Sequence, residues 1–213
     1  MWNRVEFKQR GKEAFQKNYI ASVLAAFIMV LITSGGASIG TNASDSEGAG
    51  MFMAFGTMAM FLLTVFLFNV IEVGGCKFFI ENRNSQPKFT KVIDGFQSSF
   101  YVNIVVVQLL RMVKTFLWSL LFIVPGIIKM YEYRMIPYIL AEHPDIDQKN
   151  AFMVSKNMMN GHKMELFILD LSFIGWMFVS ALTFGFAGIF YVFPYVQATM
   201  AEVFAYNKEN YRM

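Results

Sequence analysis

Residues 101–124 read YVNIVVVQLLRMVKTFLWSLLFIV, a run of 24 residues with only two charged side chains, Arg111 and Lys114. A transmembrane helix needs about 20 consecutive, predominantly apolar residues. The stretch therefore predicts a membrane-spanning helix.

The composition of the whole chain agrees with a membrane protein. Its 213 residues are 56% hydrophobic, with 24 Phe and 16 Met, and only 15% are charged, against about 25% in soluble domains. The single cysteine, Cys76, excludes an internal disulfide. The sequence has no dense basic run and no Cys/His metal pattern, so nucleic-acid binding, a metal site and a cofactor are not expected. We expect an all-α, polytopic membrane helix bundle.

Five further apolar runs lie on either side of residues 101–124 and predict about six transmembrane helices in one bundle. The predicted spans are 19–34, 51–73, 101–124, 127–141, 164–182 and 187–206. Short turns at Pro125-Gly126 and at Thr183–Gly185 are expected to join neighbouring spans as antiparallel hairpins. Pro137 in the fourth span and Pro194 in the sixth predict helix kinks.

The first 18 residues are polar and basic, with a weak apolar side formed by Trp2, Val5, Ala14 and Phe15. This pattern predicts a cytoplasmic amphipathic helix at residues 1–18, which either lies on the membrane surface or leads into the first span through solvent. A cleaved signal peptide is the less favoured alternative, because an n-region of this length with two glutamates is unusual.

The distribution of Lys and Arg predicts the orientation. With the N-terminus inside, the cytoplasmic segments are 1–18, 77–98, 142–163 and the tail 207–213, and they hold 14 of the 18 Lys and Arg residues. The loop 35–50 and the two turns on the opposite side hold none. Because basic loops stay in the cytoplasm, we expect a multi-pass protein of the cytoplasmic membrane with both termini inside.

Aromatic residues near the ends of the predicted spans fit this orientation, since Trp and Tyr gather at membrane–water interfaces. Tyr19, Tyr101 and Tyr206 are expected at the inner ends of their helices, and Trp118 and Trp176 toward the outer ends. In the cytoplasmic segment 142–163, Asp147 is expected to cap a short helix.

Ionisable residues interrupt the apolar runs, and each would cost roughly 2.5–3.5 kcal/mol at the bilayer centre without a partner. Five of them fall in the inner half of the membrane and are predicted to form an ion-paired polar cluster open to the cytoplasm: Glu72, Arg111, Arg134, Asp170 and Glu202. The alternative is a set of static pairs that only lock helices together. Both interpretations require that most of these charges are paired.

Helical spacing adds further residues to the candidate site. Gln108, Arg111 and Thr115 share one stripe of the third span. The fourth span is polar on two sides, so it is expected inside the bundle rather than against lipid. The secondary members of the predicted cluster are Lys114, Glu132, Tyr138, Tyr195 and Thr199.

Three stretches resemble a bacterial integral membrane family catalogued as domain of unknown function 975. They are PGIIKMYEYRMIPYILAEHPDI from residue 125, AFMVSKNMMNGHKMELFILDLSFIGW from residue 151 and FPYVQATMAEVFAY from residue 193. The resemblance implies a multi-helix cytoplasmic-membrane protein and brings no activity. It implies that these positions belong to recurring motifs: Pro125, Gly126, Tyr138, Ser155, Gly161, Asp170, Trp176 and Pro194. Arg111, Lys114 and Glu132 do not match the pattern.

Two functions fit these observations. The first is transport or permeation through the polar cluster, because proline-broken helices beside intramembrane charges are typical of substrate pathways. The second is a non-catalytic membrane subunit or scaffold of an envelope or lipid-handling complex. An enzyme is not expected, because the sequence has no P-loop, nucleophile elbow or HExxH motif. Membrane lipids, and either a membrane-protein partner or a second copy of the chain, are the expected partners.

Overall fold

The structure is a computed structural model that describes residues 2–35, 55–59 and 62–211. Every regular element in these ranges is helical, which confirms the all-α prediction. The predicted loop 35–50 lies almost wholly outside the described residues, as does the start of the predicted span 51–73.

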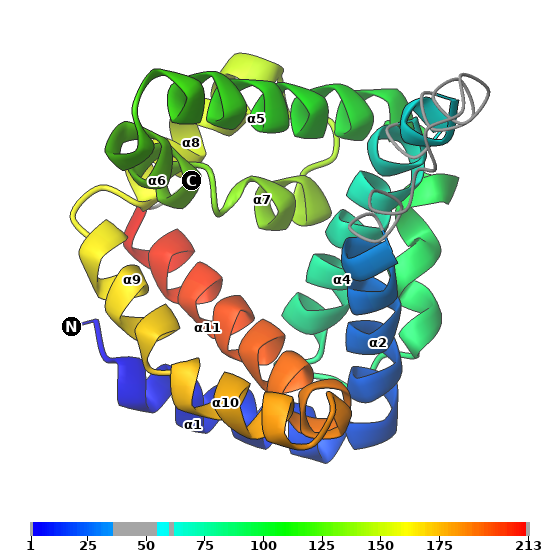
Figure 1. Cartoon of the computed structure of the whole chain (residues 1–213), viewed down its shortest axis with the longest axis vertical. Coiled ribbons are helices and arrows are strands. Elements are labelled where there is room, and N and C mark those ends of the chain that lie inside the picture. The colour runs from blue at the N-terminus through cyan, green and yellow to red at the C-terminus, as the bar shows by residue number, and fades with distance from the viewer. Residues whose placement is uncertain (1, 36–54, 60–61, 212–213) are drawn as a thin grey trace, which may run out of the picture.

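The helices follow one another along the chain with few long connections. The first are α1 (Arg4–Lys17), α2 (Tyr19–Gly35), the π-helix η1 (Thr64–Phe68), α4 (Asn69–Glu81), the 3₁₀ helix η2 (Phe89–Gln97) and α5 (Tyr101–Leu121). Then come α6 (Ile123–Glu132), α7 (Ile136–Glu142), α8 (Gln148–Met158), α9 (Lys163–Leu171), α10 (Ile174–Leu182), the π-helix η3 (Gly188–Val192) and α11 (Phe193–Tyr211). Figure 1 shows α5, α2 with α4, and α1 with α10 along three sides, while α7 and α11 run between them.

Among the described residues, two helices are long and apolar enough to cross a membrane. One is α5, and the other is the continuous stretch from Lys163 to Leu182 that contains α9 and α10. A third crossing is added if α1 and α2, which meet at 106°, form one bent span. Apolar side chains on these helices face outward: Leu120 in α5 is 73% exposed, and α10 has no buried residue. Exposed apolar surface of this extent indicates contact with membrane or another apolar surface.

The hairpin of α5 and α6 turns earlier than predicted. Phe122, in an extended conformation, separates the two helices, and Pro125 and Gly126 lie in the first turns of α6. Proline is tolerated there because the first N–H groups of a helix have no intrahelical acceptor. Gly126 allows close packing instead of forming the turn, since a Cβ at this position would come within 2.7 Å of the Ser119 Cα in α5.

The fourth predicted span, 127–141, is not a single helix. α6 ends at Glu132, a turn follows at residues 133–135, and α7 begins at Ile136. Pro137 therefore lies in the first turn of a new helix, and the predicted kink is a complete break. Pro137 has no N–H to donate to the Tyr133 carbonyl four residues earlier. That carbonyl accepts instead from the Ile136 N–H at 3.3 Å. With ten and seven residues, neither helix reaches the length of about 20 that a crossing requires.

The second half of this broken span forms the centre of the core. The residues of α7 from Ile136 to Ala141 are all buried, and the Ile136 and Ile139 side chains are fully enclosed. In α6, by contrast, Ile127 and Ile128 are each 46% exposed. The predicted position inside the bundle is therefore right for α7 and wrong for the first half of α6.

α1 packs antiparallel along α11. Near the start of α1, the Phe7 ring lies 5.3 Å from the Tyr206 ring, and near its end the Phe15 ring lies 5.4 Å from the Tyr191 ring. Between them the backbones are close, since a Cβ on Gly11 would come 2.7 Å from the Thr199 nitrogen. The buried residues of α1 are Phe7, Gly11, Ala14 and Phe15. This spacing of four, three and one residues is a single helical face. It includes Ala14 and Phe15 of the predicted apolar side, whereas Val5 is 66% exposed.

This pairing corrects the predicted topology at both ends of the chain. The sequence predicts a surface helix at 1–18 and a crossing helix at 187–206, whereas two helices packed along their length share one inclination to the membrane. The ends of α1 contact segments that are predicted to be cytoplasmic. Trp2 stacks on His162 with ring centroids 6.3 Å apart, and the Asn18 side chain donates to the Pro87 carbonyl at 2.9 Å. The structure does not support a separate sixth crossing.

The predicted aromatic belts also need correction. The Tyr19 hydroxyl donates to the Phe190 carbonyl at 3.0 Å, and the Trp176 ring lies 5.1 Å from the Tyr191 ring. Tyr19 and Trp176 therefore adjoin the same helical turn, although the predicted topology assigns them to opposite faces of the membrane.

The predicted cap of α8 is confirmed, because the Asp147 carboxylate accepts from the Lys149 N–H at 3.0 Å.

Candidate functional site

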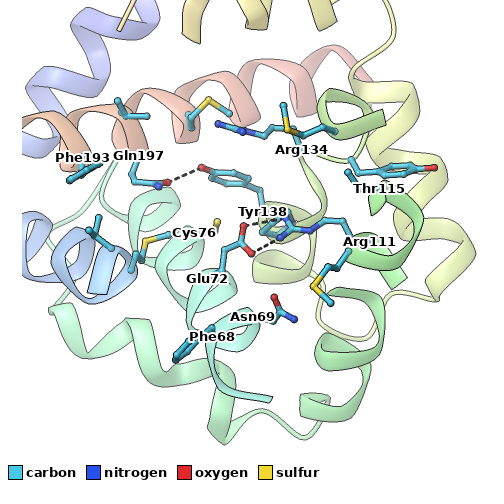
Figure 2. Close-up of a pocket in the computed structure, with 18 of the residues that line it drawn as sticks. Phe68, Asn69, Glu72, Cys76, Arg111, Thr115, Arg134, Tyr138, Phe193 and Gln197 are labelled. Carbon is cyan, nitrogen blue, oxygen red and sulfur yellow. Dashed lines mark hydrogen bonds and ion pairs between the residues drawn. The ribbon is translucent and has the colours of Figure 1, made fainter. Parts of the chain in front are cut away.

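An open cavity of about 910 Å³ lies between α2, α4, α5, α7 and α11, and Figure 2 shows most of the side chains that line it. Small-molecule sites typically measure about 300–1,000 Å³, so this one is large. The apolar part of the wall includes Met29, Val30, Phe68, Met112, Phe116, Met130, Phe193, Val196 and Met200. The polar part includes Asn69, Glu72, Arg111, Thr115, Ser119, Arg134, Tyr138 and Gln197.

Glu72 of α4 and Arg111 of α5 form a two-pronged ion pair in this wall (Figure 2). The Arg111 Nη1 and Nη2 atoms lie 3.2 and 2.6 Å from the two carboxylate oxygens of Glu72. The Gln108 side chain donates a third hydrogen bond to the same carboxylate at 3.2 Å. Forked Arg–carboxylate pairs are among the strongest ion pairs in proteins. Both oxygens of the Glu72 carboxylate therefore already accept hydrogen bonds from protein side chains.

Arg134 is paired much more loosely. It lies in the turn between α6 and α7, and its Nη2 is 4.0 Å from the Asp170 carboxylate of α9, beyond hydrogen-bonding distance. Asp170 accepts a closer hydrogen bond from the Tyr131 hydroxyl, at 2.9 Å. The Arg134 side chain is 37% exposed and lines the cavity, whereas Asp170 does not.

Two π-helical segments lead directly into the cavity wall. η1 ends at Phe68, next to Asn69 and Glu72, and η3 precedes Phe193 and Gln197. Each contains a carbonyl that accepts from a tyrosine hydroxyl of another helix: Tyr101 donates to Phe66 at 2.8 Å, and Tyr19 donates to Phe190 at 3.0 Å. π-bulges occur frequently at functional sites.

Pro194 explains the hydrogen bond in η3. Proline has no N–H, so the carbonyl four residues earlier, that of Phe190, loses its helical donor. The Tyr19 hydroxyl replaces that donor. The kink predicted at Pro194 therefore takes the form of a π-helical segment immediately before α11.

The five residues of the predicted cluster do not meet as one group. Glu72, Arg111 and Arg134 line the cavity, and Asp170 approaches Arg134 from outside it. Glu202 lies elsewhere, at the junction of α1, α4 and α11. Its carboxylate accepts two hydrogen bonds from Arg83, at 2.9 and 3.3 Å, and lies 4.0 Å from Arg10.

Of the secondary residues, only Tyr138 lines the cavity. The Lys114 ammonium lies 3.6 Å from the centre of the Phe152 ring. Glu132 is buried and pairs with Lys129 at 2.8 Å and Lys163 at 3.0 Å.

Tyr195 and Thr199 lie on the face of α11 that packs against α1: the Tyr195 ring is 6.2 Å from Phe15, and Thr199 is the close neighbour of Gly11. Together with Glu202, these residues form a polar stripe on α11, spaced four and three residues apart, and this stripe lies at the interface with α1.

Gln197 and Asn69 line the cavity but were not predicted as part of the site. Gln197 lies two residues from both Tyr195 and Thr199, so it points away from the α1 interface and into the cavity. Its amide oxygen accepts from the Tyr138 hydroxyl at 3.4 Å (Figure 2). Asn69 precedes Glu72 by three residues, a spacing that places both on one helical face. Asn69 could therefore have been predicted from its spacing to Glu72, whereas no neighbouring residue in the sequence indicates that Gln197 belongs to the site.

Within the described part of the chain, no group of three or more His, Cys, Asp or Glu side chains could hold a metal ion.

Residues 123–208 match the model of a family described as protein of unknown function (DUF975). The match confirms the resemblance for the segment from α6 to α11. Arg134, Tyr138 and Gln197 lie within it, and Glu72 and Arg111 precede it. Comparison with curated proteins and with solved structures gave no match.

Three motif positions in the matched segment have a clear structural reason. The Ser155 hydroxyl donates to the buried Glu132 carbonyl at 2.7 Å and joins α8 to α6. Gly161 has φ +83°, a left-handed conformation that suits glycine, in the turn between α8 and α9. Asp170 holds the Tyr131 hydroxyl and faces Arg134.

Proposed function

We propose that this protein is a non-enzymatic, multi-pass protein of the cytoplasmic membrane that binds a small solute in the central cavity and lets it pass. The observation that carries the proposal is the cavity itself. It lies among helices that are interrupted beside it, its wall combines apolar surface with an ion pair and a loosely paired arginine, and it is open. Broken helices that line polar cavities are typical of transport pathways.

We also propose that both termini lie on the cytoplasmic side. Contacts between predicted cytoplasmic segments support this orientation. Trp2 stacks on His162, His162 packs edge-on against Tyr206, and the Lys208 ammonium pairs with Glu142. These contacts gather the N-terminal helix, the segment 142–163 and the end of α11 in one region. The strong excess of Lys and Arg in the same segments supports the assignment of that region to the cytoplasm.

Passage through the cavity can be tested in proteoliposomes. We expect the protein to accelerate either the efflux of trapped carboxyfluorescein or the dithionite quenching of an inner-leaflet NBD-labelled phosphatidylglycerol. The variant Thr115→Trp places a bulky ring on the cavity wall and should abolish the acceleration. The matched control is Val113→Trp on the same helix, where the side chain is 41% exposed and does not line the cavity. Equal rates for the two variants, or no acceleration by the wild-type protein, would refute the proposal.

A further inference from the structure

We infer that the cavity takes the anionic head group of an amphiphile and that Arg134 holds the anion. The inference rests on the proposed function in one respect, that the cavity is the solute site. It adds the chemical class of the solute and the residue that selects it.

The charges in the cavity wall do not balance. Glu72 and Arg111 cancel each other, because both carboxylate oxygens of Glu72 accept from Arg111 and one also accepts from Gln108. The other charged residue in the wall is Arg134. The described lining therefore carries one net positive charge, which attracts an anion and repels a cation.

The Arg134 guanidinium still has hydrogen-bonding capacity. Its ionic contact within the described part of the chain is the 4.0 Å approach of Asp170, a distance that leaves room for a closer acceptor. A guanidinium has five N–H donors in a planar fork that fits a carboxylate or a phosphate. The side chain is 37% exposed at the open cavity, so a ligand can reach it and gain a charge-assisted hydrogen bond from it.

Two amides supply further donors. Gln197 uses its oxygen to accept from Tyr138, which leaves its amide hydrogens for a ligand. Figure 2 shows Gln197 and Arg134 on the same side of the Glu72–Arg111 pair and Asn69 on the other. The buried Asn69 Nδ2 has no hydrogen-bond partner among the described residues. Donors without acceptors favour a ligand that is rich in acceptor atoms.

The rest of the wall fits an apolar chain. Met29, Met112, Met130 and Met200 line the cavity together with Phe68, Phe116 and Phe193. Methionine side chains are flexible and polarisable, so they adapt to chains of different shape. A small inorganic anion would leave this surface uncovered, whereas an amphiphile covers it and brings its acidic group to Arg134.

Three probes separate the head group from the chain. Dodecyl phosphate carries both, dodecanol carries only the chain, and inorganic phosphate carries only the anion. The thermal unfolding midpoint of the full-length protein is measured in a neutral detergent, with each probe at a small mole fraction of the detergent. We expect a saturable rise with dodecyl phosphate and little or none with the other two. A response to inorganic phosphate alone would overturn the apolar part of the inference, and equal responses to dodecanol and dodecyl phosphate would overturn the role of the anion.

Variants at Arg134 and Asp170 separate ligand binding from a structural ion pair. Arg134→Gln should weaken binding of dodecyl phosphate at least tenfold, as expected for loss of a charge-assisted hydrogen bond. Asp170→Asn removes the facing carboxylate and should leave binding unchanged or strengthen it. Each response is compared with the midpoint of the same variant without probe, so a change in stability does not mask it. If both variants weaken binding equally, the pair is structural and the inference fails.

Two controls complete the experiment. Lys156→Gln removes one positive charge from an exposed position on α8 and should leave binding unchanged. Binding of dodecyl phosphate without any acceleration of transport would refute the proposed function and leave the inference intact. Transport of neutral or cationic solutes without binding of dodecyl phosphate would do the reverse.

Discussion

Replacing helical glycines by alanine, one at a time, tests the closest helix contacts of the fold. An added Cβ on Gly74 of α4 would lie 1.9 Å from the Val92 carbonyl oxygen in η2, and one on Gly11 of α1 would lie 2.7 Å from the Thr199 nitrogen in α11. The three atoms nearest to a Cβ added to Gly75 all belong to the Met29 side chain, which can move. The Cβ added to Gly175 of α10 meets nothing within 4 Å.

The structure sets the order of the effects on stability. Alanine is favoured over glycine within a helix by up to about 1 kcal/mol, and Gly175→Ala should gain up to this amount. At Gly11 the two backbones must separate by at least about 0.7 Å to reach ordinary contact at 3.4 Å. A gap of roughly 0.5–1 Å costs a quarter to a half of the dispersion energy of each affected contact, and overpacking typically costs about 1–3 kcal/mol. Gly11→Ala should therefore lose up to about 2 kcal/mol net, and Gly74→Ala should lose more.

Thermal unfolding in one mild detergent, followed by tryptophan fluorescence, measures this order. For a chain of this size about 1 kcal/mol shifts the midpoint by roughly 2–4 °C. We expect Gly175→Ala to be at or above the wild-type midpoint, Gly75→Ala to be close to it, Gly11→Ala to be lower and Gly74→Ala to be lowest. If Gly11→Ala raises the midpoint as Gly175→Ala does, α1 does not pack against α11 as described, and the correction to the predicted topology is lost with it.

Two further pairs of substitutions test the polar interactions around the cavity. Tyr19→Phe should cost about 1 kcal/mol, a typical value for one hydrogen bond. Tyr19→Phe in a Pro194→Ala background should cost less, because alanine at this position restores an N–H donor for the Phe190 carbonyl. Equal shifts of the unfolding midpoint in the two backgrounds would contradict this account. Glu72→Leu alone should destabilise, because it leaves Arg111 without its partner. The loss should be smaller than the roughly 3–5 kcal/mol of a fully buried pair, since the two side chains are 37% and 23% exposed. The double variant Glu72→Leu/Arg111→Met should recover most of the loss in the same assay.

The helical class and most element ends could be predicted because apolar runs, caps and turn residues are local signals. Asp147 caps α8 as its sequence context indicates, and the turn at Thr183–Gly185 contains two left-handed residues, Phe184 and Gly185. The orientation of the helices could not be predicted in the same way. The close contact between α1 and α11 depends on Gly11, because Thr199 lies directly opposite it. No local sequence pattern indicates that these two residues, far apart in the chain, come together.

The candidate site was predicted in part, for a related reason. The charges at Glu72 and Arg111 were conspicuous because charge in an apolar run needs a partner, and the structure gives each the other. The same reasoning grouped Glu202 with them, but its partner is Arg83 in the connection after α4. Charge identifies which residues need partners, and only the packing of helices decides which partner each one receives.

The packing also separates the two interpretations of the charges that interrupt the apolar runs. Glu202 with Arg83 and Glu132 with Lys129 and Lys163 are buried carboxylates with close basic partners, as static locks should be. Arg134 differs, because its facing carboxylate is 4.0 Å away and its side chain borders a cavity.

Three helix interruptions also adjoin this one cavity. They are η1 before Asn69, η3 before Phe193 and the turn that carries Arg134. Each interruption exposes backbone polar groups, which are costly in an apolar setting unless tyrosine hydroxyls or shorter hydrogen bonds satisfy them. A structural lock requires none of these irregularities, whereas a site that admits a ligand between helices requires both the space and the unsatisfied donors. Arg134 is therefore the charge in this set for which binding explains more than stability does.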